Sequence, residues 1–108
     1  MAYKATHRHA QISARKVRAL ADLVRGKRVD DALAILRYQP QRGARLLEKV
    51  IKSALGNAED QRAPNVAGLR IVDARIDGGP MFKRLRPGAR GMAHVIKRRF
   101  SHISVEVE

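Results

Sequence analysis

The sequence predicts an α+β fold, in which a small antiparallel sheet packs on three helices and a long β-hairpin arm protrudes from the domain. Apolar residues recur at helical spacing between residues 13 and 60, which indicates amphipathic helices. Two runs rich in β-branched residues, 69–76 and 103–107, are typical of strands. Between them, the basic segment 78–101 carries Pro87-Gly88 near its middle, a pair that favours a tight turn and therefore a hairpin. Helices and an antiparallel sheet around one core make an α+β domain.

The composition indicates one small domain with a polyanionic partner. At 108 residues the chain has the length of a single domain, and we expect residues 1–108 to form it, with the extended basic hairpin 78–101 within it. Twenty-three Lys and Arg against ten Asp and Glu give a formal net charge of +13, which attracts nucleic acid or an anionic membrane. The lack of cysteine excludes disulfides and thiolate metal sites. No apolar run has the length of a spanning helix and no signal peptide is visible, so we expect a cytoplasmic protein without membrane contact.

The first segment, Tyr3 to His9, is expected to be a short strand or an extended tail, because it alternates irregularly and no helix cap precedes Ser13. His7 and His9 stand two residues apart, a spacing that would allow a metal ion to bind to a strand. No Asp, Glu or Cys stands nearby to complete such a site. We therefore expect no metal and interpret Arg8 and His9 as part of a basic segment that faces solvent or RNA.

A first helix is predicted at 13–25. Ser13 is a good N-cap, and the apolar residues that follow it at helical spacing are Val17, Leu20, Ala21 and Val24. Gly26 provides the left-handed residue beyond its end. Cations occupy the first turns, where the helix dipole disfavours positive charge, and more cations follow the C-terminus. These residues, Arg15, Lys16, Arg18, Arg25, Lys27 and Arg28, are interpreted as a phosphate-binding face.

Two further helices are predicted at 30–38 and 41–60. Asp30 is expected to cap the first of them, and Pro40 ends it. Its apolar side is Ala32, Leu33, Ile35 and Leu36. The longer helix carries Ala44, Leu47, Ile51, Ala54, Leu55 and Ala58 on one face, which makes it the main core helix. Glu48 and Lys52 stand at i, i+4 on its solvent side.

The strand that leads into the arm is expected to begin at Leu69, after a loop at 61–68. Its apolar residues change phase at Val72, so either both faces are partly covered or a bulge reverses the alternation. We predict a register with Ile71 opposite Ile103 and Leu69 opposite Val105. This register leaves a three-residue tip at 87–89, in which Gly88 takes a positive φ.

The arm is expected to project beyond its own domain. About ten residues at roughly 3.3 Å each span about 30 Å, whereas a compact domain of this length has a radius of gyration near 13 Å. From Gly78 to Val105 the segment has no acidic residue. Isolated hairpins are marginal in water, so the arm needs a partner, and its charge favours a polyanion.

No enzyme and no cofactor are expected. The sequence has no carboxylate pair in a plausible pocket, no nucleophile elbow and no Gly-rich loop between a strand and a helix. Two alternatives to an RNA-binding protein remain. A DNA-binding architectural protein would need wedge residues at the tip and a two-fold dimer surface. A nucleic-acid-processing enzyme would need an acidic or histidine cluster, and we find none in the sequence.

Several stretches also resemble a known family. They are SARKVRALADLVRGK, VDDALAIL, SALGNAED, GPMFKRLRPGARG and KRRFSHISVEV. In this order they are similar to large-subunit ribosomal protein number twenty-two, in its bacterial type. The resemblance implies a structural constituent of the large ribosomal subunit, with its domain on the outer surface and its hairpin threaded through ribosomal RNA to the wall of the nascent-peptide exit tunnel. The implied partners are large-subunit ribosomal RNA, neighbouring ribosomal proteins at the tunnel and, transiently, the nascent peptide. No homo-oligomer is expected.

The residues expected to contact RNA come from the N-terminal segment, the first helix and both limbs of the hairpin. They are Arg8, His9, Arg15, Lys16, Arg18, Arg25, Lys27, Arg28, Lys83, Arg84, Arg86, Arg90, Lys97, Arg98, Arg99 and His102. The resemblance places Phe82, Lys83, Arg84, Pro87, Gly88, Arg90 and Gly91 at the tunnel wall. The chain departs from the family's usual pattern at Phe82, where Met is common, and at Gly88 and Met92, where basic residues are usual. Phe82 is a candidate for stacking on a base, whereas Tyr3, Tyr38 and Phe100 are interpreted as core or hinge packing.

Overall fold

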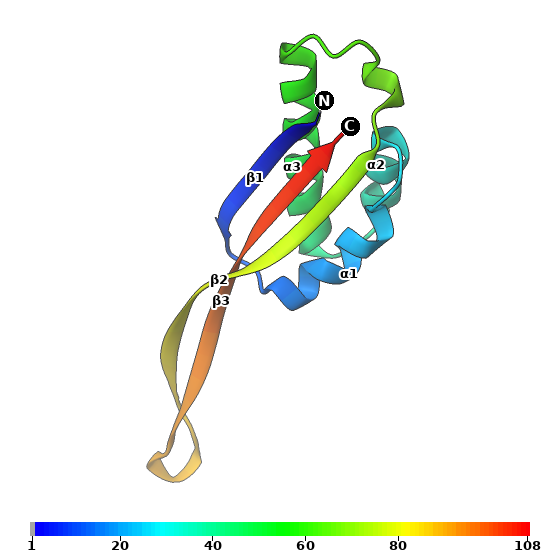
Figure 1. Cartoon of the computed structure of the whole chain (residues 1–108). Helices are drawn as coiled ribbons and strands as arrows, with labels where there is room; N and C mark the ends of the chain where they lie inside the picture. Colours follow the sequence, from blue (N-terminus) through cyan, green and yellow to red (C-terminus); the bar gives the residue numbers. More distant parts are fainter. Residues whose placement is uncertain (1) are drawn as a thin grey trace.

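The computed structural model describes residues 2–108 and confirms the α+β class (Figure 1). The elements, in chain order, are β1 (Tyr3–Ala10), α1 (Ala14–Val24), α2 (Val29–Arg37), α3 (Arg42–Asp60), β2 (Ile71–Pro87) and β3 (Ala93–Val107). The three strands form an antiparallel sheet in the order β1-β3-β2. The helices cover one face of this sheet, and the distal parts of β2 and β3 extend beyond it as a twisted ribbon.

Helix α1 follows the prediction within a residue at each end. Its buried side is Val17, Leu20, Ala21 and Val24. Ser13 occupies the N-cap position, but its side chain makes no capping hydrogen bond. Gly26 has the expected positive φ of 84°, and its N–H donates to the carbonyl of Ile71 at 2.8 Å. The turn after α1 is therefore joined to the start of β2.

Helix α2 begins earlier than predicted, because its start is held by the segment just before β2 and not by an acidic cap. Arg28, not Asp30, is the N-cap residue, and Val29 is the first helical residue. The Val29 N–H donates to the carbonyl of Leu69 at 3.1 Å, and its side chain is buried. Asp30 lies in the first turn instead, where the helix dipole still favours a carboxylate.

Helix α3 is the core helix, as predicted. Its buried residues are Gly43, Ala44, Leu47, Val50, Ile51, Ala54 and Ala58. Glu48 differs from expectation, because its partly buried carboxylate contacts the Arg45 guanidinium at 3.0 Å rather than Lys52. Arg45 also donates to the carbonyl of Leu36 at 2.7 Å, which ties α3 to the end of α2.

Strand β3 is the centre of the sheet. Tyr3–Ala10 is a strand and not a tail, and it pairs with β3 from Tyr3 opposite Val107 to His7 opposite Ile103. A bulge follows between His7 and Ala10, and His9 within it has a positive φ of 58°. The sheet residues that face the helices belong to the same buried cluster as α1, α2 and α3.

The predicted register of β2 on β3 is wrong. Ile71 pairs with Val107 rather than Ile103, and Ile76 pairs with Ile103. Of the two explanations for the change of phase, the bulge is correct: the register shifts between Ile71 and Asp73, and Val72 is left 47% exposed. The displacement comes from the tip, which lies further along the chain than predicted; the shift at Val72 and a second irregularity between Gly78 and Met81 each place an extra residue on β2 and reduce it by one residue. Matching apolar residues across the strands did not identify these extra residues.

The arm is residues 81–99, which pair from Met81 opposite Arg99 to Pro87 opposite Ala93. We call the junction between the arm and the domain, Gly78–Phe82 of β2 with Arg98–His102 of β3, the neck. The molecule measures 64 × 25 × 16 Å along its principal axes, with a radius of gyration of 16.8 Å. The arm therefore reaches well beyond the domain, whose two chain ends lie away from the tip (Figure 1).

The tip is not the predicted three-residue turn. Pro87 is the last residue of β2, and a short 3₁₀ turn, Ala89–Gly91, precedes β3. Gly88 has a φ of −113°, so it does not supply the positive φ. Arg90 and Gly91 do, at 59° and 72°. The Gly88 N–H donates to the carbonyl of Met92 at 2.5 Å, and this hydrogen bond closes the tip.

Candidate nucleic-acid interface

Two basic grooves meet where the arm leaves the domain. The first, of about 780 Å³, lies between the start of α1, the start of α3 and β3, and its cations are Lys16, Arg42, Lys97, Arg98 and Arg99. The second, of about 940 Å³, lies between α1 and the neck, and its cations are Arg15, Lys16, Arg18 and Arg99. Lys16 and Arg99 line both grooves, and no acidic residue lines either. The fold thus brings cations from distant parts of the chain around one entrance.

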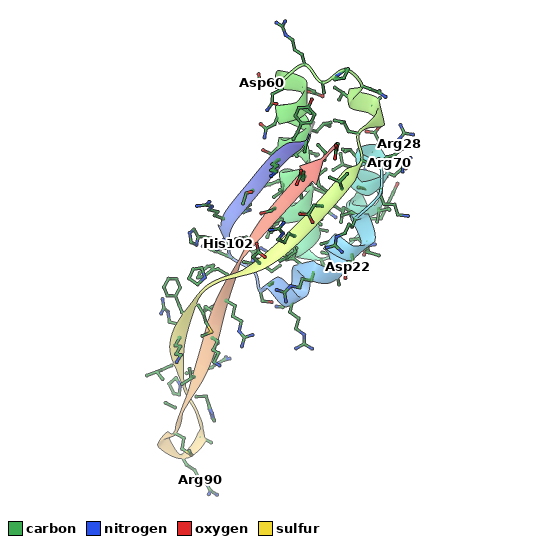
Figure 2. All side chains as sticks on the ribbon, viewed as in Figure 1. Asp22, Arg28, Asp60, Arg70, Arg90 and His102 are labelled. Atoms are coloured by element: carbon green, nitrogen blue, oxygen red, sulfur yellow. The ribbon has the colours of Figure 1, made fainter. Side chains whose placement is uncertain are left out.

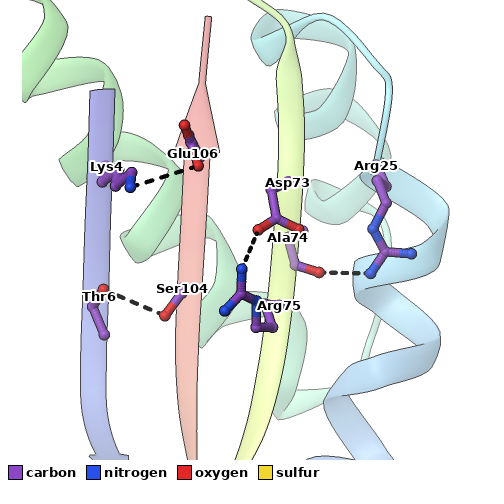
Figure 3. Close-up of polar contacts among 8 residues, drawn as sticks. All are labelled: Lys4, Thr6, Arg25, Asp73, Ala74, Arg75, Ser104 and Glu106. Atoms are coloured by element: carbon purple, nitrogen blue, oxygen red, sulfur yellow. Dashed lines mark hydrogen bonds and ion pairs between the residues drawn. The ribbon is translucent and has the colours of Figure 1, made fainter. Parts of the chain in front are cut away.

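The cations of the predicted phosphate-binding face fall into two groups. Arg18 donates through Nε and Nη2 to the carbonyl of Ile76, both at 3.2 Å. Arg25 donates to the carbonyl of Ala74 at 2.6 Å and to Asp22 at 2.7 Å, and Figure 3 shows the first of these bonds. Arg28 donates to the carbonyl of Ala67 at 2.9 Å. These three arginines bind backbone carbonyls of the domain itself, and their RNA contact stays a prediction.

Arg15, Lys16 and Lys27 form the second group. All three are exposed, and within residues 2–108 their side chains make no hydrogen bond or ion pair. Arg15 and Lys16 lie in the first turn of α1, at the groove entrance. Of the predicted helix cations, these are the ones whose charge is available to a ligand.

The cations of the arm point into solvent along both strands and at the tip (Figure 2). Lys83, Arg84 and Arg86 are on β2, Arg90 is in the tip, and Lys97, Arg98 and Arg99 are on β3. Lys83 lies directly opposite Lys97, and like charges in such a cross-strand pair destabilise a sheet. The arm has no carboxylate to relieve this repulsion. An external polyanion would do so.

The remaining predicted residues are spread between the neck and the tip. The His9 N–H donates to Nδ1 of His102 at 3.1 Å, beside the neck, and Arg8 is exposed on β1. Pro87, Gly88 and Gly91 are in or next to the tip, whereas Phe82 is at the neck. The candidate tunnel residues therefore follow the length of the arm and do not gather in one place.

Sequence reasoning missed Arg42 and misjudged Tyr38. Arg42 is in the first turn of α3, lines a groove, and donates to the carbonyl of Gln11 at 2.9 Å. Like Arg15, Arg42 is a cation at a helix start, so the same signal marks it in the sequence. Tyr3 is buried, as expected, but Tyr38 is 81% exposed. Its position at the C-cap of α2 turns it away from the core.

Comparisons with known proteins find similar sequences in one family. The model of the family described as ribosomal protein L22p/L17e matches residues 5–108. The large ribosomal subunit protein uL22 of Rhodopirellula baltica is 60% identical over 108 residues, covering 95% of this chain and 91% of the relative. The uL22 proteins of Caldicellulosiruptor saccharolyticus and a Thermotoga species are 52% and 44% identical, covering 94% and 96% of this chain and 83% and 65% of those relatives. Within residues 2–108, no helix is long and apolar enough to cross a membrane.

Proposed function

Because this chain belongs to the ribosomal protein L22p/L17e family, we propose that it binds large-subunit ribosomal RNA through its basic grooves and its arm, and that the arm helps to line the nascent-peptide exit tunnel. A member of this family is a non-enzymatic structural protein of the large subunit of the cytoplasmic ribosome. Its partners are therefore ribosomal RNA and other ribosomal proteins, not DNA or a chemical substrate. The DNA-binding alternative is set aside on this ground.

The observation that carries the proposal is a long ribbon of unpaired positive charge. The arm has no acidic residue, and its strands place Lys83 against Lys97. An extended ribbon can enter crevices between RNA helices that a globular surface cannot reach. Its cations would neutralise phosphates from several strands at once, so the arm would fix their packing. Ordering the arm on RNA would lower the net affinity by the entropy that the ordering costs.

The tunnel part of the proposal rests on the reach of the arm and on the family resemblance. Phe82, Lys83 and Arg84 on β2 and Pro87, Gly88, Arg90 and Gly91 toward the tip are the residues proposed to form the wall. Neighbouring ribosomal proteins at the tunnel and, transiently, the nascent peptide would contact this surface. The sequence departures at Phe82 and Gly88 fall within it.

Gradient co-sedimentation with large-subunit particles that lack this protein tests the proposal. The first variant replaces residues 83–97 with an Asn-Gly turn, which preserves the pairing of Phe82 with Arg98 and a hairpin connection. The second is Arg15→Ala with Lys16→Ala, which removes free charge but leaves the hydrogen bonds of Arg18 in place. We expect the full chain to enter the particle, and we expect each variant to be displaced at a lower salt concentration than the full chain.

Three outcomes would contradict the proposal or its part on the arm. If the full chain stays at the top of the gradient, the chain does not bind the particle. If it binds duplex DNA as tightly as ribosomal RNA at moderate salt, the architectural alternative returns. If the shortened arm incorporates with unchanged salt resistance, the domain alone carries the affinity and the arm contributes nothing to RNA binding.

A further inference from the structure

The chain places both of its phenylalanines outside the core, at the neck. Phe82 is 48% exposed and Phe100 is half-buried. Neither belongs to the buried cluster or to the apolar residues that pack against it. Their ring centroids are 5.3 Å apart and the rings are nearly perpendicular, at 82°. The pair steadies the neck, but packing in the core does not explain why two large rings stand in solvent among cations.

These rings belong to a row of flat side chains. The guanidinium carbon of Arg84 lies 5.3 Å from the centroid of the Phe82 ring. Phe100 and His102 are two residues apart on β3, so they project from the same face of the strand. At the far end, the His9 and His102 rings are 5.0 Å apart, and Figure 2 shows His102 where the arm leaves the domain.

The order of the row, from the arm to the domain, is Arg84, Phe82, Phe100, His102 and His9. The backbone holds part of it in place, because the His9 N–H donates to Nδ1 of His102 at 3.1 Å. Gly79 lets β2 approach β3 beside the rings: a β-carbon at this position would lie 3.0 Å from the carbonyl oxygen of Phe100. The flat groups therefore lie on paired strands whose backbones approach closely at the neck, and not on an irregular loop.

Flat groups beside cations have a particular ligand chemistry. Single-stranded RNA is bound by stacking its bases on aromatic rings or guanidinium planes while cations contact its phosphates. Arg98 provides such a cation on the same face of the ribbon, because it pairs with Phe82 and lies two residues from Phe100. Lys83 and Lys97 lie on the opposite face, and no carboxylate lies between residues 78 and 105. In a duplex each base is already stacked on its neighbours, so its faces cannot reach an aromatic side chain.

We propose that the aromatic neck, the row of Arg84, Phe82, Phe100, His102 and His9, is a stacking site for unpaired RNA bases. The inference rests on the proposed RNA-binding function and adds that one of the bound nucleotides is unpaired. The grooves and the arm hold phosphates of any RNA, whereas the aromatic neck selects a nucleotide that is not in a helix. It would anchor the domain end of the arm at one unpaired nucleotide.

The test uses the full chain and two RNA probes of equal length. One is a short single-stranded oligouridylate, whose bases stack only weakly on one another, with 2-aminopurine at its centre, and the other is the same strand in a blunt duplex. Stacking on a ring quenches 2-aminopurine. We expect the full chain to bind the single strand more tightly than the duplex and to quench its label.

The variants separate stacking from charge. Phe82→Leu and Phe100→Leu should each weaken binding of the single strand by about 5-fold to 100-fold, reduce the quenching, and leave the salt dependence of binding unchanged. Lys97→Ala should weaken binding to both probes and reduce the log–log salt slope by about 0.7 to 0.9. Phe82→Tyr keeps a ring and should bind like the full chain. Leu85→Ala removes an apolar side chain that is 74% exposed but has no ring, and should leave the quenching unchanged.

The outcomes distinguish the two proposals. If both leucine variants bind and quench like the full chain while Lys97→Ala still weakens binding to both probes, the aromatic neck is not a stacking site and the RNA-binding function stands. If the full chain binds neither probe, the proposed function fails together with the inference. Thermal unfolding checks that the variants fold, and Phe82→Leu, at a half-exposed position on the arm, remains informative even if Phe100→Leu does not fold.

Discussion

At the scale of single residues, the fold gives arginine two roles. Some arginines bind backbone carbonyls of the domain, whereas others, such as Arg15, keep their charge available to a ligand. Arg18 and Arg25 bind the carbonyls of Ile76 and Ala74 on the outer edge of β2. Nearer the start of the strand, the N–H groups of Gly26 and Val29 bind the carbonyls of Ile71 and Leu69. An open strand edge invites pairing with another chain, so this set of donors closes the edge of the sheet within the domain.

This division predicts opposite effects for two arginines of the same region. Arg25→Ala should lower the free energy of unfolding by about 1 kcal/mol, since it removes a charged donor from a half-exposed carbonyl bond. Arg15→Ala should leave stability within about 0.5 kcal/mol but should weaken RNA binding more than Arg25→Ala does. Urea unfolding and a filter-binding titration measure the two quantities. A larger loss of RNA affinity for Arg25→Ala would show that its charge and not its backbone bond is the important property.

At the scale of elements, the neck determines how the hairpin leaves the sheet. The register shifts between Gly78 and Met81, and the two glycines there differ in their surroundings. A β-carbon at Gly79 would lie 3.0 Å from the oxygen and 3.1 Å from the carbon of the Phe100 carbonyl, whereas one at Gly78 would meet nothing within 4 Å. Backbone atoms cannot yield as the end of a flexible side chain can.

Gly79→Ala should therefore destabilise the neck, and Gly78→Ala is its matched control. We expect the first to lower the free energy of unfolding by about 1–2 kcal/mol, as overpacking does, and to lower the melting temperature by several degrees. The second should stay within about 0.5 kcal/mol of the original chain. Equal melting temperatures for the two variants would mean that β2 and β3 separate at the neck without cost.

At the scale of the whole molecule, stability is concentrated in one half. The buried cluster spans α1, α2, α3 and the domain part of the sheet, whereas every residue from Met81 to Arg99 except the partly buried Gly88 is exposed. Regions with few buried apolar contacts and exposed backbone hydrogen bonds open locally at little cost. The free chain is thus a folded domain with a weakly held arm.

Hydrogen exchange should show this difference directly. We expect the amides of 81–99 to exchange much faster than those of α3 in the free chain. Binding to ribosomal RNA should slow exchange in the arm by at least about tenfold, which corresponds to about 1.4 kcal/mol. An arm that is equally protected with and without RNA would mean that the hairpin is rigid on its own.

The features that depended on periodicity were predictable from the sequence. The core faces of α1 and α3 and the existence of the arm follow from spacing and charge. The register was not predictable, because the bulge at Val72, which leaves both Ile71 and Ala74 buried, and the irregularity between Gly78 and Met81 each change which residues pair. The separation of Arg15 from Arg18 and Arg25 was not predictable either, since it depends on which helix residues reach the edge of β2. Nor was the contact of Phe82 with Phe100, which requires the true register.

The strand order has a consequence for how the protein is made. β3 comes after β1 and β2 in the chain but lies between them, so neither outer strand has a partner until residues 93–107 have been synthesised. The β1–β3 pairs must close a loop of nearly the whole chain, as from Tyr3 to Val107, and non-local closure of this kind slows folding. Before β3 is made, only the helices and the edge of β2 that α1 binds can begin to associate. The sheet, and with it the crossing that orients the arm, forms in one late step.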